Sequence, residues 1–288
     1  MPSDVYRFVA PSQMYSIASC RTWNLGDLPQ DGKRVVLDLS RLRTVTPTTM
    51  VGLVVAVARW YGEGHPLTIH SPTNEYARRM METIGFVEAL ETFVPVERGR
   101  EADGPIRRLL PVINLRNFRI SGDVEVLADE LVEVFSAKNY TDGVLNQEAA
   151  GVIAEAASNV LYHARSASGG FALAQLRQRR TVSSGPSWWI EIAVGDAGQG
   201  IAASLGYDDP VSAVRDALDE GVTSTNDRTR GIGLHWIEEV VFRSKFRFLM
   251  VHSDHGLVVS VAGDREATHA ENCFPGTLLT VAIPVGNP

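Results

Sequence analysis

The second half of the sequence contains two helical segments followed by a run of strand-like segments, and this order restricts the fold more than any other feature. The first helix follows Ser121, a good N-cap, and has apolar residues at helical spacing. The second helix carries the stretch EAASNVLYHA. The strand-like segments after it are GFALAQLR, SWWIEIAVGD, FRFLMVHS, GLVVSVAG and GTLLTVAIP. Helices followed by strands predict an α+β sandwich, with the helices on one face of a mixed sheet.

The first half has a different pattern, in which strands alternate with helices. RVVLDLS and PLTIHS are strand-like, and each is followed by a segment with helical character. This alternation predicts an α/β layer. A charged stretch with Gly and Pro separates the halves, so we predict a domain at 1–100, a linker at 101–110 and a second domain at 111–288.

Composition and charge exclude several classes of protein. Lys and Arg number 27 against 34 Asp and Glu, a net charge of -7, which argues against nucleic-acid binding. Cys20 and Cys273 lie far apart without Cys-x-x-Cys spacing, which predicts reduced, buried thiols and no zinc site. The N-terminus has no signal-peptide pattern, and the most apolar run is about half of the ~20 residues that a membrane span needs. We therefore expect a cytoplasmic protein that does not enter a membrane.

A polar stripe runs along the second helix. Glu155, Asn159 and His163 are spaced four residues apart, so they lie on one side of the helix at the border of an apolar face. A carboxylate, an amide and an imidazole in this position can all contact one ligand. The alternative is a row of solvated side chains beside a core-facing helix.

Three glycine-containing clusters follow the stripe. In GDAGQGI, Asp196 ends a very apolar strand and is followed by Gly198 and Gly200. A carboxylate at a strand end can accept a hydrogen bond from an exocyclic amine, and glycines let the backbone approach a flat ring. RGIGLHW opens a helix whose N-terminal amides can hold phosphate, and FPGTLL enters the last strand. Each cluster alone is also compatible with an ordinary turn.

The order and spacing of these motifs resemble the GHKL ATPase superfamily, which includes DNA gyrase, heat-shock chaperones and sensor histidine kinases. Residues of about 111–284 carry the resemblance, which implies a Bergerat-type α/β sandwich that binds ATP and Mg²⁺. On this basis Asn159 would coordinate Mg²⁺, and Glu155 would be the catalytic general base. Asp196 would bind the adenine amine, with Gly198 and Gly200 beside the base.

The same resemblance assigns an ATP lid to the segment between Gly200 and Gly231. Gly231, Gly233 and Leu234 would then cover the phosphates, and Thr277 would lie near the adenine. Arg230 ends a polar stretch in which arginines could close on phosphate. A solvated surface loop is the alternative for that stretch.

The segment RVVLDLSRLRTVTPTTMVGLVVAVARW resembles the STAS domain of anti-sigma-factor antagonists. In that family a strand leads through an Asp-Ser-Ser-Gly loop, whose serine is phosphorylated, into a helix. The matching residues here run from Thr46 to Thr49, so the acidic residue and the glycine are missing. Thr48 and Thr49 are possible phosphoacceptors, provided that they are exposed at the helix N-terminus. A Thr-rich helix cap and a docking platform without phosphorylation remain the alternatives.

Together, the resemblances predict a STAS-like α/β domain followed by a Bergerat-type sandwich. The implied function is that of an Mg-ATP-binding regulatory protein of partner-switching type. It would hydrolyse ATP slowly or phosphorylate a serine or threonine on a STAS or sigma-factor-regulatory partner. A non-catalytic, ATP-gated interaction module stays open, and so does a homodimer.

Overall fold

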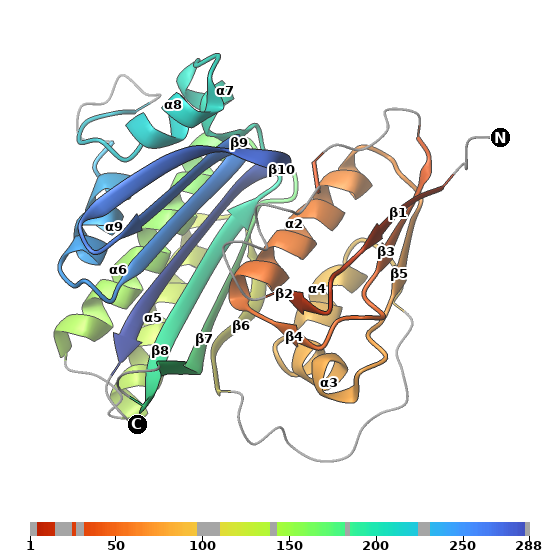
Figure 1. Cartoon of the computed structure of the whole chain (residues 1–288), viewed down its shortest axis with the longest axis horizontal. Helices are drawn as coiled ribbons and strands as arrows, with labels where there is room; N and C mark the ends of the chain where they lie inside the picture. The colour runs from red at the N-terminus through yellow and green to blue at the C-terminus, as the bar shows by residue number, and fades with distance from the viewer. Residues whose placement is uncertain are drawn as a thin grey trace.

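The computed structural model describes residues 5–14, 25–26, 32–96, 110–138, 143–181, 185–223 and 231–285. It is a mixed α/β structure with one parallel and one larger antiparallel sheet (Figure 1). The predicted linker at 101–110 falls almost entirely outside the described residues.

The first half contains the parallel sheet, whose strand order is β1-β3-β5. A short parallel pair, β2-β4, lies beside it. The strands are β1 (Val5–Val9), β2 (Gln13–Met14), β3 (Arg34–Asp38), β4 (Thr44–Val45) and β5 (Leu67–His70). The helices are α2 (Pro47–Gly62), α3 (Glu75–Thr83) and α4 (Phe86–Glu91). The predicted alternation of strands and helices is confirmed, and α4 is an additional helix that the sequence did not indicate.

The second half contains the antiparallel sheet, with strand order β6-β7-β8-β10-β9. The strands are β6 (Leu110–Phe118), β7 (Gly170–Thr181), β8 (Gly185–Asp196), β9 (Phe248–Val261) and β10 (Asp264–Val285). FRFLMVHS and GLVVSVAG, predicted as two strands, form the single strand β9. β10 extends well before the predicted GTLLTVAIP, through two register shifts between His269 and Thr277.

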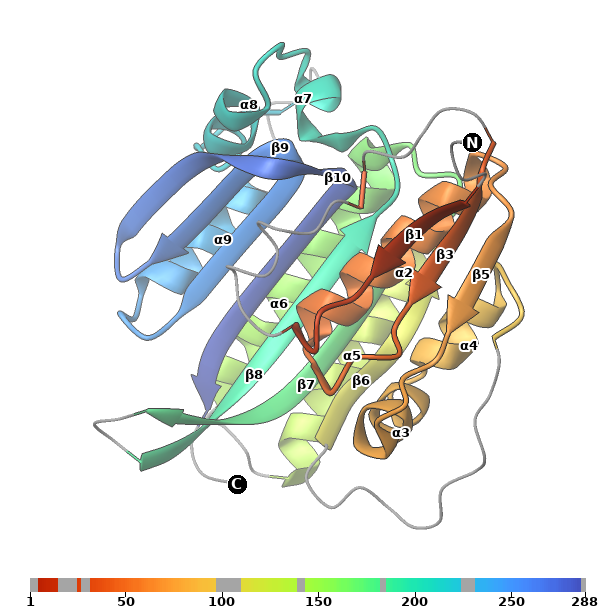
Figure 2. The same cartoon turned by 45° about the vertical axis from the view of Figure 1, so that its right-hand side comes forward.

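The helices of the second half cover one face of this sheet, as predicted from the order of elements (Figure 2). They are α5 (Ser121–Lys138), α6 (Gly143–Asn159), the π-helix η1 (Val160–Ala164), α7 (Gly200–Leu205), α8 (Pro210–Asp216) and α9 (Gly233–Phe242). Ser121 is the first residue of α5 and not its N-cap. Ile190, Ile192 and Val194 of β8 face the core between this sheet and these helices.

Helix α2 covers the other face of the same sheet. It lies between the two sheets and packs against β7, β8 and β10 (Figures 1 and 2). Thirteen of its 16 residues are buried, so it has no solvated face of the kind that an amphipathic helix presents. Phe171, Leu173 and Ala193 of the antiparallel sheet share one hydrophobic core with the strands of the first half. The two halves are therefore joined by a continuous apolar core.

Buried hydrogen bonds join the first turn of α2 to the antiparallel sheet. Thr48 Oγ1 donates to Glu191 Oε1 of β8 at 2.9 Å, and Thr280 Oγ1 of β10 donates to Thr48 Oγ1 at 3.0 Å. Arg177 of β7 forms an ion pair with Glu191 Oε2 at 3.1 Å. The carboxylate of Glu191 is thus satisfied by a hydroxyl from α2 and a guanidinium from the sheet.

This contact bears on the two possible phosphoacceptors. Thr48 is 9% exposed and Thr49 is 1% exposed, so the condition of exposure at the helix N-terminus is not met in this arrangement. Thr46 is the residue that caps α2, since its hydroxyl accepts the Thr49 amide at 3.2 Å. The role of a helix cap, predicted as the alternative for this loop, is the one that these contacts support.

None of the helices in the described ranges combines the length and the apolar character that crossing a membrane requires.

We expect Thr48→Val to lower the free energy of unfolding by about 1–3 kcal/mol. Valine keeps the shape of threonine but leaves the buried Glu191 without one of its donors. Urea denaturation of the whole chain measures the change. Thr73→Val is the matched control, because the Thr73 hydroxyl donates to the Ser40 carbonyl at an exposed site. Equal effects of the two substitutions would show that the Thr48 contact does not stabilise the packing of α2.

Candidate functional site

A cavity of about 100 Å³ lies between the helical face of the antiparallel sheet and the helices α6, α7 and α9. Residues from widely separated parts of the sequence line it. Those predicted as site residues are Asn159, Asp196, Gly200, Gly231, Gly233, Leu234 and Thr277, with His163 beside them. The apolar lining includes Val160, Val194, Ile201, Leu205 and Leu279. A mainly apolar wall with a few polar groups is typical of a small-molecule site.

Among the described residues, Asp196 is the one acidic residue in the lining of this cavity. It is 1% exposed and lies at the end of β8, opposite Thr277 of β10. Within the described residues, its carboxylate accepts one hydrogen bond, from the Gly198 amide at 2.7 Å. Burial raises the pKa of Asp196 to about 7, against the lowering effect of that hydrogen bond. Such a carboxylate has unused acceptor capacity toward a ligand that donates.

Gly198 is required by a close approach of two backbone segments. A Cβ at this position would lie 2.0 Å from the Ala164 carbonyl oxygen and 2.8 Å from Asp196 Oδ1. Any side chain here would separate the end of η1 from the turn after β8. The glycine therefore sets the position of the Asp196 carboxylate against the helix layer, whether or not it also contacts a ligand.

The polar stripe predicted on α6 lines a second, outer cavity of about 560 Å³. Glu155, Asn159 and His163 all contribute to its wall, together with Trp236 of α9. Asn159, His163, Gly231 and Gly233 line both cavities, so the two are adjacent. The predicted shared orientation of the stripe is confirmed.

Asn159 and Glu155 differ in their environment within this stripe. Asn159 Nδ2 is buried and has no hydrogen-bond partner among the described residues. The side chain of Glu155 is exposed and lies against α9, where a Cβ on Gly233 would be 2.5 Å from its Oε2. An unsatisfied amide next to an accessible carboxylate is a costly arrangement without a ligand, and therefore a candidate polar binding site.

The helix carrying the stripe changes from α to π geometry directly after Asn159. The wider turn leaves carbonyl groups available to the segment after β8. Gln199 Nε2 donates to the His163 carbonyl at 2.8 Å, and the Gln199 amide donates to the Ala164 carbonyl at 2.9 Å. π-helical turns are frequent at functional sites. This one ties the stripe to the Asp196 turn.

Ser253 of β9 is a structural residue that sequence analysis missed. Its hydroxyl accepts the Ile201 amide at 2.9 Å and donates to the Gly276 carbonyl at 2.8 Å. It also lies 3.3 Å from Thr277 Oγ1. Ser253 thus joins the start of α7 to β10 beside the cavity. A single serine inside an apolar strand gives no sequence signal of this role.

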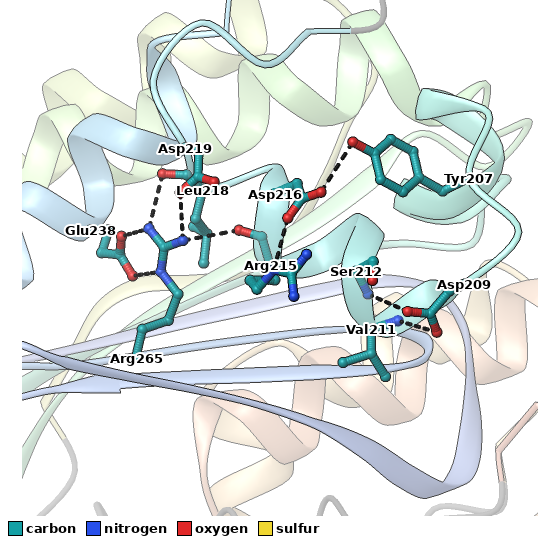
Figure 3. Close-up of polar contacts among 10 residues, drawn as sticks. All are labelled: Tyr207, Asp209, Val211, Ser212, Arg215, Asp216, Leu218, Asp219, Glu238 and Arg265. Atoms are coloured by element: carbon teal, nitrogen blue, oxygen red, sulfur yellow. Dashed lines mark hydrogen bonds and ion pairs between the residues drawn. The ribbon is translucent and has the colours of Figure 1, made fainter.

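The segment predicted as a lid is helical over its first part and is held at its base by charged contacts (Figure 3). Asp209 caps α8 through the amides of Val211 and Ser212. Arg265 of β10 forms ion pairs with Asp219 and with the buried Glu238 of α9. These contacts fix α8 to α9 and to β10. Residues 224–230, including Arg230, lie outside the described residues.

The described site residues therefore come together around adjacent cavities. Gly198 is absent from the lining but bonds to Asp196, and Glu155 lines the outer cavity alone. Thr48 and Thr49 lie elsewhere, against the opposite face of the sheet.

Comparisons with protein-family models, with curated proteins and with solved structures found no match to this chain.

We expect Asp196→Asn to change the pH dependence of stability. In the wild type the native carboxyl keeps its proton up to about pH 7, whereas the unfolded carboxyl loses it near pH 3.8. The contribution of Asp196 to stability is therefore complete below about pH 3.8 and is lost as the pH rises through about 7. Asparagine resembles the protonated acid and does not titrate.

The free energy of unfolding of Asp196→Asn minus that of the wild type should accordingly rise between pH 4 and pH 8, by up to about 4 kcal/mol. Denaturation at a series of pH values measures it. A difference that stays constant over this range would contradict the raised pKa.

Proposed function

We propose that this chain binds Mg-ATP across the two adjacent cavities and acts as a regulatory protein of partner-switching type, with a GHKL-like ATPase domain. The observation that carries the proposal is the Asp196 carboxylate, which is buried at the inner cavity and has one backbone donor among the described residues. Other residues that the GHKL resemblance assigns to ATP contacts line the same cavity and come from separate segments of the chain, namely Asn159, Gly200, Gly231, Gly233, Leu234 and Thr277.

The inner cavity suits an adenine ring. Its apolar walls can hold the two faces of a flat base, and a buried carboxylate can accept a hydrogen bond from the exocyclic amine. Guanine has a carbonyl oxygen at the equivalent ring position, which would face the carboxylate as a second acceptor. The proposal therefore includes a preference for adenine over guanine.

The outer cavity suits the phosphates and the metal ion. The Nδ2 atom of Asn159 has no partner in the part of the chain that the structure describes, and a half-turn of the amide group presents its oxygen to a hard cation. Bound Mg²⁺ would neutralise phosphate charge and orient the terminal phosphate. Glu155, on the same side of α6 and accessible from the cavity, is the group that would accept a proton from the attacking water or hydroxyl. Its target would be either water or a serine or threonine of a partner.

We also propose that the first half is a STAS-like docking domain. Thr48 and Thr49 are buried on the sheet face opposite the cavities, which argues against self-phosphorylation in this arrangement. A phosphoryl acceptor would then be a separate protein. We propose a partner of STAS or sigma-factor-regulatory type, recognised by exposed surfaces of the chain.

One observation favours a second candidate function, a non-catalytic module in which ATP controls partner affinity. The α2 contact and the cavity lining lie on opposite faces of the same strand, β8. Nucleotide binding next to Asp196 could therefore influence the packing of the first half without any turnover. Binding and turnover measurements separate the two functions.

We expect the wild type to bind ATP with Mg²⁺ more tightly than GTP, as measured by calorimetry. Asp196→Asn should weaken ATP binding by about 10- to 150-fold, the equivalent of about 1.5–3 kcal/mol for a charge-assisted hydrogen bond. Asp264→Asn, at the exposed first residue of β10, is the matched carboxylate control and should bind ATP as the wild type does. Unchanged ATP affinity in Asp196→Asn would refute the adenine assignment.

We expect Glu155→Gln to retain ATP binding and to lose turnover. Removing a general base typically lowers the rate by about 10²- to 10⁴-fold. The measurement is ADP release, or phosphate transfer to an added STAS protein, with Asp264→Asn as the control. Equal rates for the wild type and Glu155→Gln would favour the non-catalytic module.

A further inference from the structure

Asp254, His255 and Cys273 form a cluster of potential metal ligands where the middle parts of β9 and β10 pair. One ligand atom from each residue lies within 4.8 Å of the other two. Cys273 Sγ donates to Asp254 Oδ1 at 3.2 Å, and His255 Nε2 lies 3.9 Å from the same oxygen. All three side chains are partly exposed, so an ion can enter from solvent.

These separations are close to the edges of a zinc coordination tetrahedron. Zn–S bonds of ~2.3 Å and Zn–O or Zn–N bonds of ~2.0–2.1 Å give edges of ~3.6 Å for S···O and ~3.3 Å for N···O. The observed S···O and N···O distances depart from these edges by at most about 0.6 Å. The Cys273 sulfur and a ring nitrogen of His255 also lie within 4.8 Å of each other, so side-chain rotations would bring the three ligand atoms around one ion.

The hydrogen bonding of His255 prepares it as a ligand. Its Nδ1 lies 3.3 Å from the Ala270 carbonyl oxygen, which can only accept, so Nδ1 carries the proton. In the neutral ring, Nε2 then has a lone pair directed toward the cluster. A backbone carbonyl that fixes the tautomer of a histidine in this way is typical of metal-ligating histidines. The ring of His269 stacks on His255, with the centroids 4.9 Å apart, and supports its orientation.

The backbone of both strands departs from regular β geometry at this cluster. The register of β9 and β10 shifts between His269 and Phe274 and again between Phe274 and Thr277. Asp254 has a φ of 53°, which is unusual for a residue other than glycine. These irregularities bring residues that are 19 positions apart in the sequence to the same point of the sheet.

We propose that Asp254, His255 and Cys273 bind a divalent transition-metal ion of the zinc type. A thiolate, an imidazole and a carboxylate together select zinc over magnesium or calcium. On binding, the Cys273 sulfur gives up its proton to solvent and forms the metal–sulfur bond, and water occupies the remaining position. The spacing of the two cysteines predicted no zinc site. The proposed site uses only one of them, Cys273, and its other two ligands, Asp254 and His255, come from β9.

This ion would stabilise the contact between the two halves of the chain. The Gly26 amide donates to the Cys273 carbonyl at 3.1 Å, and a Cβ on Gly26 would lie 2.8 Å from Cys273 Sγ. Trp60 of α2 donates to the carbonyl of the neighbouring Leu25 at 3.0 Å. Metal binding at Cys273 would therefore hold the Leu25–Gly26 segment in place, and this segment in turn bonds to Trp60 of α2. The proposal does not depend on ATP binding.

The test uses full-length protein without a histidine tag, stripped with a chelator and titrated with Zn²⁺ or Co²⁺. We expect one equivalent of zinc to bind and to raise the midpoint of thermal unfolding. The cobalt form should show a thiolate-to-cobalt absorption band in the near ultraviolet. Cys273→Ser should remove the band, and both Cys273→Ser and His255→Gln should weaken zinc binding by more than about 100-fold, because loss of a second-shell partner alone costs about 10- to 100-fold.

Cys20→Ser is the matched control, since it removes the other cysteine of the chain and should keep the band. Circular dichroism of the metal-free variants establishes that each is folded. Any one of three results would overturn the proposal. These are absence of zinc binding in the wild type, a zinc affinity of folded Cys273→Ser or His255→Gln equal to that of the wild type, and loss of the cobalt band in Cys20→Ser.

Discussion

The burial of β8 on both of its faces is the constraint on which the rest of the structure depends. Ile190, Ile192 and Val194 pack against α6 and the other helices of the second half, whereas Ala193 packs into the core that α2 shares with the parallel sheet. An antiparallel sheet commonly leaves one face to water, but the central strand β8 is buried on both faces. The segment SWWIEIAVGD accordingly has an apolar content that one buried face alone would not require.

Two buried carboxylates on this strand differ in their contacts. The contacts of the first indicate a structural role, and those of the second indicate a candidate binding role. Glu191 faces α2 and is satisfied by the Thr48 hydroxyl and by Arg177. Asp196 faces the helices, has one backbone donor within the described residues, and has a pKa raised to about 7 by burial. A buried charge is costly unless it is paired, so Asp196 is the position on β8 where a ligand would improve the electrostatics.

The sequence predicted most of the elements because their periodicity is a local property. Asn159 and His163 share one side of a helix by spacing alone, and the apolar run from Met50 to Ala58 indicated a buried helix. What this helix packs against is not a local property. The apolar residues around α2 are compatible with burial in a core of the first half alone, and equally with burial in a core that both halves share. The contacts of Ser253 and the cluster at Cys273 depend on the register of β9 and β10, including its shifts, and register is not encoded in residue spacing.

The position of α2 also limits how a protein partner can bind. Because α2 occupies the outer face of β7, β8 and β10, a partner can reach this face only by displacing a helix with 13 buried residues. Removing so much apolar surface from a shared core would cost far more than a typical regulatory coupling of about 1–3 kcal/mol. A partner of the proposed kind must therefore use surfaces that are already exposed. Any influence of nucleotide on that partner would pass through small adjustments at β8, where the Asp196 cavity and the Thr48 contact lie on opposite faces of one strand.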